Sequence, residues 1–279
     1  MSDIPVGEQV SPSRVKLTEV SNKPLVTSKV TDSAFEKILP FSTDLELRDR
    51  YINFFGGLRL GKMLEDLDLI AGEVAYKHTE GWERGMTIVT AACDRIDLLG
   101  ELRSDRDLQL LSSINWVGRS SLEVGVRISS KEGKSWVRVA RAYFIMVARS
   151  EGKAEPVNSL EPVNKNEQRR FKQGEQRQQE RRAIAQTSYL HNTPTADESH
   201  VLHDLFLLIK NNEIKGVSMK DSIRQSTLLM HPQSRNVHNN IFGGYLMREA
   251  FELAWNITYL FCKKRPQFVS MDHMYFYRP

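Results

Sequence analysis

The chain has 279 residues, of which 40% are hydrophobic and 27% charged, with 39 Lys and Arg against 35 Asp and Glu. This length predicts two domains of ordinary size, and the composition excludes a disulfide scaffold, a collagen-like chain and a fully disordered chain. The net charge of +4 gives no large single-sign field of the kind that draws nucleic acid over a long surface.

The two cysteines, Cys93 and Cys262, lie far apart and belong to no Cys-x-x-Cys or Cys/His cluster. Such usage favours a reducing compartment and argues against a zinc ribbon. No apolar run approaches the roughly 20 residues that span a bilayer, so no membrane span is expected. The first residues carry carboxylates, including Asp3 and Glu19, whereas transit peptides are poor in acid. Residues 1–34 are expected to be mobile.

The first helical signals follow this segment. Ser42 or Thr43 is placed to cap a short helix that reaches about Phe54, and Glu46 stands three residues after Thr43, as in a capping box. Apolar residues then recur at helical spacing over residues 59–78, which predicts one long amphipathic helix. Those apolar residues are Leu60, Met63, Leu64, Leu67, Ile70, Ala71, Val74 and Ala75.

Strand-like segments come next and are joined by turn signals. Gly118 marks a hairpin between the second and the third, and residues 131–134 turn the chain between the third and the fourth. Alternation is clearest in the third segment, in which Leu122 and Val124 share one face. A long helix laid on such an antiparallel meander is an α+β layer pair, which we expect over residues 35–150. The four segments are residues 87–96, 108–116, 121–130 and 135–148.

Residues 151–218 are expected to form a charged linker with helices. Seven Lys and Arg and three Glu lie between Lys165 and Arg182, which indicates a solvated segment and surface helix. The alternative is a nucleic-acid-binding arm, which is disfavoured because Phe171 is the one aromatic residue there. A capped helix follows over residues 194–210, with Thr195 as the cap and Glu198 three residues later.

The last part of the chain, residues 219–279, echoes the first unit. A strand is expected over residues 221–230, a helix over 245–261 and another strand over 267–277. A Phe-Gly-Gly sequence stands before the long helix in both copies. Strand, loop, glycines, helix and strand therefore recur after about 180 residues, as an internal repeat with degenerate sequence.

These residues are recognisable as a family. NNIFGGYLMREAFELAW followed by FVSMDHMYFYRP resembles the hotdog-fold acyl-coenzyme A thioesterases. LRLGKMLEDLD and INWVGRSSLEVGVRI resemble the first hotdog of the two-hotdog members, of the mitochondrial acyl-coenzyme A thioesterase 9 type. The resemblance implies an α+β double hotdog, in which a long central helix is wrapped by an antiparallel sheet, with the second hotdog incomplete.

The resemblance also implies an activity, the hydrolysis of fatty acyl-CoA to free fatty acid and CoA. The CoA enters with the substrate, so no separate cofactor and no metal is implied. Related hotdogs pair and assemble further, which implies a homo-oligomer. A mitochondrial location is implied in the same way, with the cytoplasm as the alternative because the N-terminus lacks a clear transit peptide.

In the family the catalytic carboxylate lies on the central helix, seven residues after the second glycine. Counting from Gly61 gives Asp68, and counting from Gly244 gives Phe251, so the first copy alone keeps the acid. The second copy keeps Asn240. The resemblance therefore implies one site, with Asp68 as general base or nucleophile and Asn240 polarising the thioester carbonyl.

The opposite pairing joins Gly57, which stands where the first copy would have its Asn, to Phe251, and is expected to be inert. At the Asp68 site, the backbone N–H of Gly244 is the second carbonyl donor, since the start of a helix offers free N–H groups. Gly243 lacks a Cβ and lets the substrate approach these donors closely.

A helical wheel places Asp68 at the edge of the apolar stripe, whereas Glu65 and Asp66 point away as ordinary surface acids. Glu252, next to Phe251, is the fallback acid. The Val-Gly-Arg-Ser-Ser turn resembles the segment that lies near the pantetheine and phosphates of CoA in this family. Its residues, expected to bind CoA, are Val117, Gly118, Arg119, Ser120 and Ser121.

The second copy departs from the family pattern because it supplies two strands where a hotdog needs about five. We expect an unpaired sheet edge there, with lower stability and weaker activity than in a complete relative. The alternative function is therefore a weak or inactive paralogue that binds acyl-CoA or acts in assembly. A hotdog dehydratase is disfavoured because neither central helix carries a suitably placed histidine. The preferred acyl chain length is not predicted.

Overall fold

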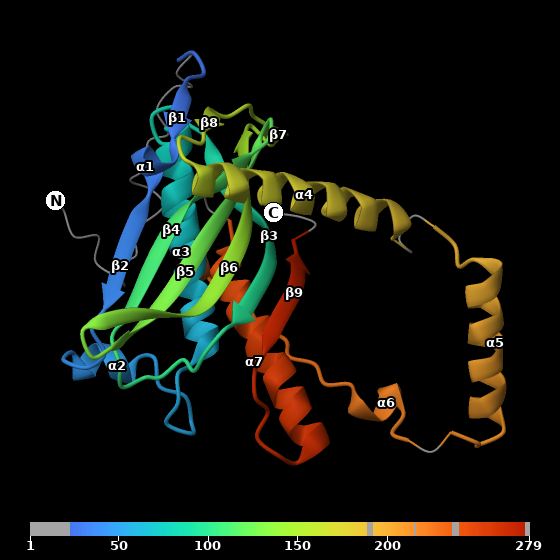
Figure 1. Cartoon of the computed structure of the whole chain (residues 1–279). Helices are drawn as coiled ribbons and strands as arrows, with labels where there is room; N and C mark the ends of the chain where they lie inside the picture. Colours follow the sequence, from blue (N-terminus) through green and yellow to red (C-terminus); the bar gives the residue numbers. More distant parts are fainter. Residues whose placement is uncertain (1–22, 189–191, 215, 236–239, 277–279) are drawn as a thin grey trace.

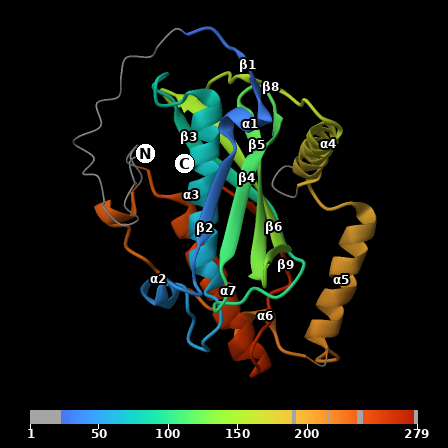
Figure 2. The same cartoon turned by 60° about the vertical axis from the view of Figure 1, so that its left-hand side comes forward.

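The computed structural model describes residues 23–188, 192–214, 216–235 and 240–276. Its centre is an antiparallel sheet with two long helices, α3 and α7, on one face and a third, α4, on the other (Figures 1 and 2). The strands follow the order β2-β4-β5-β6-β3-β9, and β7 adds to β6. The expected α+β hotdog arrangement is confirmed.

The long helix α3 (Leu60–Thr79) forms as its apolar stripe predicts, within one residue at each end. It buries Met63, Leu67 and Ile70 against the sheet. Its last turn ends at Glu80 in the left-handed conformation. The strands that hold it are β3 (Thr87–Leu98), β4 (Leu108–Val117), β5 (Ser121–Glu132) and β6 (Ser135–Ser150).

Residues near the N-terminus differ from the prediction of a mobile segment. From residue 27 onward they form β1 (Thr27–Lys29), α1 (Val30–Ser33) and β2 (Phe35–Leu39). Val30 and Ser33 are buried, and β2 pairs with β4 as one edge of the sheet. The polar sequence hid this edge because β2 is covered on one face only. Two short strands complete this region, β7 (Lys153–Ala154) and β8 (Ser159–Glu161), and β8 pairs with β1.

The helix expected after Thr43 is shorter than predicted. It is α2 (Leu45–Asp49), and its cap is Asp44, whose side chain accepts a hydrogen bond from the Leu47 N–H at 2.8 Å. Neither Ser42 nor Thr43 caps it. Ser42 instead donates from Oγ and from its backbone N–H to Asp107 at 2.6 and 2.9 Å, which ties this loop to the start of β4.

Asp66 is the clearest error among the helix residues. It was expected on the surface, yet it is fully buried, where the Tyr51 hydroxyl donates to it and Lys37 lies 3.2 Å from it. The chain that precedes α3 covers this face of the helix. A helical wheel shows only the residues of the helix itself, so it could not predict this burial. Glu65, also expected to be a surface acid, is largely buried against Arg248 of α7.

The charged segment packs more closely than a solvated linker would. Helix α4 (Lys165–Thr187) crosses the outer face of the sheet, opposite α3 (Figure 2). Gly174 lies against Trp116, and Arg177 Nε donates to Glu123 at 3.0 Å. Arg181 lies 2.8 Å from Asp94, so buried ion pairs hold the helix on the sheet. The basic residues were visible in the sequence, but their buried carboxylate partners in β3 and β5 were not.

The segment between the two units continues through α5 (Ala196–Lys210), which has the predicted Thr195–Glu198 capping box and no buried residue. Then come α6 (Met219–Ser222) and a 3-10 turn (Pro232–Ser234). The strand predicted over residues 221–230 is wrong, because residues 223–230 pair with nothing. Its counterpart β2 is a strand by virtue of pairing with β4, and the described residues offer no such neighbour here.

The second copy contributes α7 (Gly243–Cys262) and β9 (Ser270–Tyr275). Helix α7 runs beside α3, and β9 pairs antiparallel with β3, so both copies share one sheet (Figure 1). Strand β9 is shorter than the predicted 267–277, and Tyr277 lies outside the described residues. Within the described part of the chain β9 is the last strand of the sheet, as expected for an unpaired edge.

We predict that Gly174→Ala lowers the free energy of unfolding by about 1–3 kcal/mol, because its new methyl group would lie 2.5 Å from Trp116 Cβ. Gly72→Ala in α3 is the matched control. No atom lies within 4 Å of a Cβ there, so this change should stabilise the protein by about 0.5–1 kcal/mol through helix propensity. Urea denaturation of both variants measures the difference, and equal effects would contradict the packing of α4.

Candidate active site

The start of α7 meets the middle of α3 at a buried carboxylate. Asp68 is 2% exposed. Thr90 of β3 donates from Oγ1 to Asp68 Oδ1 at 2.7 Å, and the Gly244 backbone N–H donates to the same carboxylate. The structure therefore brings together two of the predicted site residues, Asp68 of the first copy and Gly244 of the second.

Two glycines make this approach possible. A Cβ at Gly243 would lie 3.2 Å from both Asp68 Oδ2 and Thr90 Cβ, and one at Gly244 would lie 2.9 Å from the Cα of Glu65. A side chain at Gly244 would thus push α7 away from α3, and one at Gly243 would need Asp68 and Thr90 to give way by a few tenths of an ångström. Phe242, which precedes the helix, gives no side-chain cap, so backbone N–H groups at this helix start face the site.

The surroundings of Asp68 change its acidity. Burial raises the pKa of Asp68 to about 6, because a charged carboxylate is poorly solvated there. The hydrogen bonds from Thr90 and Gly244 act in the opposite direction and favour the ionised form. The carboxylate therefore gains and loses its proton close to neutral pH, which is suitable for a general base.

The two helices cross at an ion pair that reports how the copies are aligned. Arg248 Nη1 lies 3.1 Å from both carboxylate oxygens of Glu65. Arg248 stands 183 positions after Glu65, and Gly244 stands 183 positions after Gly61. Glu65 and Arg248 therefore occupy equivalent positions in the two copies. An ion pair between equivalent positions lies on the local twofold axis that relates the copies. The geometry therefore agrees with the alignment that sets Asp68 against Phe251.

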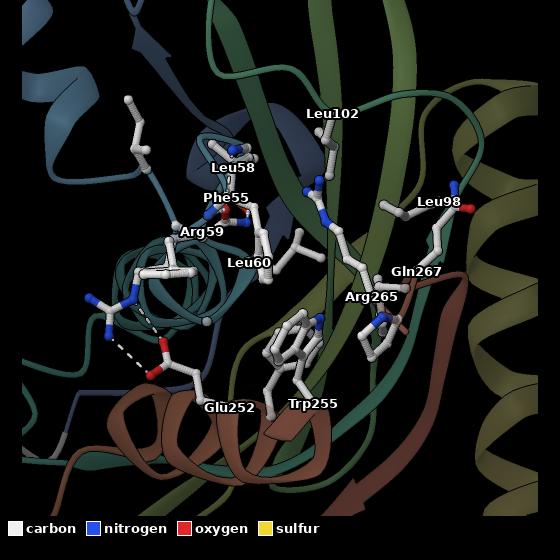
Figure 3. A pocket seen from close by; sticks show the side chains of 18 of the residues that line it. Phe55, Leu58, Arg59, Leu60, Leu98, Leu102, Glu252, Trp255, Arg265 and Gln267 are labelled. Carbon is white, nitrogen blue, oxygen red and sulfur yellow. Dashed lines mark hydrogen bonds and ion pairs between the residues drawn. The ribbon is translucent and has the colours of Figure 1, made fainter. Parts of the chain in front are cut away.

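Glu252, the fallback acid, lies away from Asp68. Arg59 donates to it from Nε and Nη2 at 2.8 and 3.0 Å, at the start of α3 (Figure 3). Phe251 and Gly57 lie in the same region and line a cavity there. Gly57 and Phe251, the pairing expected to be inert, thus lie in the same region of the structure. Phe251 takes the position that Asp68 has at the other site.

The predicted CoA-binding turn connects β4 and β5. Gly118 N–H donates to the Ser121 carbonyl at 2.7 Å, which closes the hairpin, and Arg119 is exposed. Leu122, just after the turn, pairs with Met146 of β6, which pairs with Thr90 of β3. Two strand spacings of about 4.8 Å separate Leu122 from Thr90, so the turn lies at the same end of the sheet as Asp68.

Asn240 is partly buried and lies three residues before α7 begins. Three residues of chain span at most about 11 Å, so its amide lies within reach of the helix start. Thr90 is the site residue that sequence reasoning missed. The available signal was a polar residue on the same face of a strand as Ile88, which is buried.

Part of the chain matches a known protein family. The model of the thioesterase superfamily matches residues 52–137, which include α3 and the start of the meander. The chain is 38% identical over 277 residues to the mouse protein named acyl-coenzyme A thioesterase 9, mitochondrial, with 93% of this chain covered. The chain is thus similar to the thioesterase superfamily over residues 52–137 and to this mouse relative over most of its own length.

A plant relative shows the same relation. The chain is 34% identical over 273 residues to acyl-coenzyme A thioesterase 2, chloroplastic, of Humulus lupulus, with 91% of this chain covered. It spans 63% of the length of the mouse relative and 62% of that of the Humulus protein. These two relatives are thus longer than the chain.

Among solved structures, the chain is similar to an acyl-CoA hydrolase from Staphylococcus aureus, determined in complex with butyryl coenzyme A, coenzyme A and coenzyme A disulfide. The TM-score is 0.50 at 24% identity, covering 57% of this chain and 92% of that one. This likeness establishes the hotdog fold. Within the described ranges, the structure has no cluster of three or more His, Cys, Asp or Glu placed to hold a metal, and no helix long and apolar enough to cross a membrane.

The raised pKa of Asp68 predicts how stability depends on pH. The folded protein holds the Asp68 proton more tightly than the unfolded chain, so the resulting stability is present below about pH 4 and is lost as the pH rises through about 6. Asparagine does not titrate. Asp68→Asn should therefore gain stability relative to the unmodified protein, by about 1–3 kcal/mol between pH 4 and pH 8.

Thermal or urea unfolding across this pH range measures the difference. Glu73→Gln, an exposed acid on the same helix, is the control and should give a difference that does not vary with pH. A flat profile for Asp68→Asn as well would mean that Asp68 is not buried.

Proposed function

We propose that the protein hydrolyses acyl-CoA thioesters to a free carboxylic acid and CoA. One observation carries the proposal. A buried carboxylate with a pKa of about 6 lies against the glycine start of a helix from the other copy. The match to the thioesterase superfamily and the names of the relatives support the same reaction.

In the proposed reaction, the thioester carbonyl oxygen binds at the start of α7, against the N–H groups of Gly243 and Gly244. The positive end of the helix dipole stabilises the charge that develops on this oxygen. Asn240 is the candidate for a further donor. Asp68 removes a proton from water as that water attacks the carbonyl carbon, and it returns the proton to the CoA sulfur as the carbon–sulfur bond breaks. Alternatively, Asp68 attacks the carbon itself and CoA leaves, after which water hydrolyses the resulting anhydride to the free acid and restores Asp68.

The hydrogen bond from Gly244 couples binding to basicity. Without substrate this N–H donates to Asp68 and lowers its pKa. A carbonyl oxygen that takes over the same donor would remove that effect and leave Asp68 a stronger base. Thr90 keeps its hydrogen bond and holds the carboxylate in place. The substrate would thus prepare the base that acts on it.

For the CoA moiety, we propose the turn between β4 and β5. The Arg119 guanidinium is suited to a phosphate, and the hydroxyls of Ser120 and Ser121 to further hydrogen bonds. A mitochondrial location, a homo-oligomer and a fatty acyl chain are part of the proposal. Four mammalian relatives are named as mitochondrial proteins, which supports the first of these.

Thiol release from acyl-CoAs of short to long chain tests the proposal. We expect turnover by the unmodified protein, with kcat/KM rising with pH through about 6 as Asp68 ionises. Asp68→Asn should lose about 10²-fold or more, as expected for removal of a general base. Glu73→Gln, on the exposed side of α3, should retain the activity of the unmodified protein.

The alternative is a protein that binds acyl-CoA without turnover. Folded protein that binds acyl-CoA but releases no thiol from any substrate would support this alternative and contradict hydrolysis. An Asp68→Asn variant as active as the control would leave the thioesterase reaction in place and contradict the role of Asp68.

A further inference from the structure

A cavity of about 1050 Å³ lies at the start of α3, where the repeat places the counterpart of the Asp68 site (Figure 3). Its volume is that of a small-molecule pocket. It lies between the loop that precedes α3, the second half of α7 and the segment that leads into β9. Polar and apolar residues contribute about equally to its wall, and the apolar ones include Leu58, Leu60, Leu98, Leu102, Phe251 and Phe268.

This cavity is not equipped for hydrolysis. Phe251 stands at the position equivalent to Asp68, and the carboxylate nearest the start of α3 is that of Glu252. The nearby Glu252 is bound by Arg59 through two hydrogen bonds of 2.8 and 3.0 Å. A ligand here would meet no base that could activate water.

Arg265 is the distinctive group of the cavity. Its guanidinium lies 4.9 Å from the centre of the Phe55 ring, and Figure 3 shows its side chain among Phe55, Trp255 and Leu102. No carboxylate of the described residues lies within 4.0 Å of it, in contrast to Arg59. It is exposed, so a guanidinium without a carboxylate in direct contact stands at the mouth of the cavity.

The charges of the lining select the kind of ligand. The lining contains Arg59, Arg265, Glu101 and Glu252, which sum to zero, and Arg59 is neutralised by Glu252. A polyphosphate would bring several negative charges to a single available cation. A molecule with one negative charge and an apolar body matches one arginine at the mouth and apolar residues within.

We propose that this cavity binds a long-chain carboxylate, with its carboxylate on Arg265 and its chain along the apolar residues of the wall. Asp68 lies eight residues further along α3, about 12 Å away along the helix axis. Between the two lie the fully buried Met247 and the Glu65–Arg248 ion pair. The ligand is thus held apart from the reacting group, and its binding does not rest on the proposed hydrolysis.

Binding of dodecanoate, measured by calorimetry and by tryptophan fluorescence, tests this proposal. Arg265→Gln should weaken binding about two- to fivefold, as expected for a charge pair at an exposed site. Lys264→Gln, the matched control, removes a neighbouring exposed charge outside the cavity and should leave the Kd unchanged. The methyl ester of the same acid should bind as weakly as dodecanoate binds to Arg265→Gln.

Trp255→Phe locates the ligand independently of Arg265. It should retain dodecanoate binding by calorimetry and lose most of the fluorescence response, because Trp255 lines the cavity. The proposal is overturned if Arg265→Gln binds with an unchanged Kd, if the ester binds as tightly as the acid, or if Trp255→Phe keeps its full response. Tighter binding of ADP than of dodecanoate would also overturn it, in favour of a nucleotide site.

Discussion

The close antiparallel contact between α3 and α7 is the constraint on which the rest of the structure depends. It requires glycine at the start of α7, because a side chain at Gly244 would collide with α3 and one at Gly243 would crowd Asp68 and Thr90. The Glu65–Arg248 ion pair fixes the crossing point. One contact therefore sets the register of the helices and places the start of each helix against the middle of the other.

This contact carries a cost in stability. Asp68 is taken out of water with two hydrogen bonds to support it, and burial outweighs them in its effect on the pKa. A residue that destabilises the folded protein at neutral pH indicates a use for its ionised form. At the other helix start, Phe251 removes this cost and leaves a cavity. The degenerate repeat has thus produced two unlike sites from one geometry.

Several features of the fold were predictable because they depend on local sequence. The apolar stripe of α3, the four strands of the meander and the Thr195 cap follow from periodicity and capping chemistry. The pairing of Asp68 with Gly244 could be proposed because the family motif is present in complementary halves. The structure places these two residues together, and their roles in the reaction stay predictions.

Other features depend on partners distant in the chain, and sequence patterns do not report those. Asp66 is buried because Tyr51 and Lys37 cover it, and α4 is held by carboxylates in β3 and β5. The segment after α6 has the sequence of a strand, but the described part of the chain offers no neighbour for it to pair with. Thr90 was missed because a single inward polar residue in a strand is a weak signal without the carboxylate it contacts.

The central claim is that Asp68 of one copy lies buried under the helix start of the other. Carbon-13 NMR of aspartate-labelled protein tests it most directly, with the Asp68 carboxyl signal assigned by its loss in Asp68→Asn. We expect this carboxyl to titrate near pH 6, well above an unperturbed aspartate. Titration close to pH 4 would mean that Asp68 is solvated and would contradict the site built between α3 and α7.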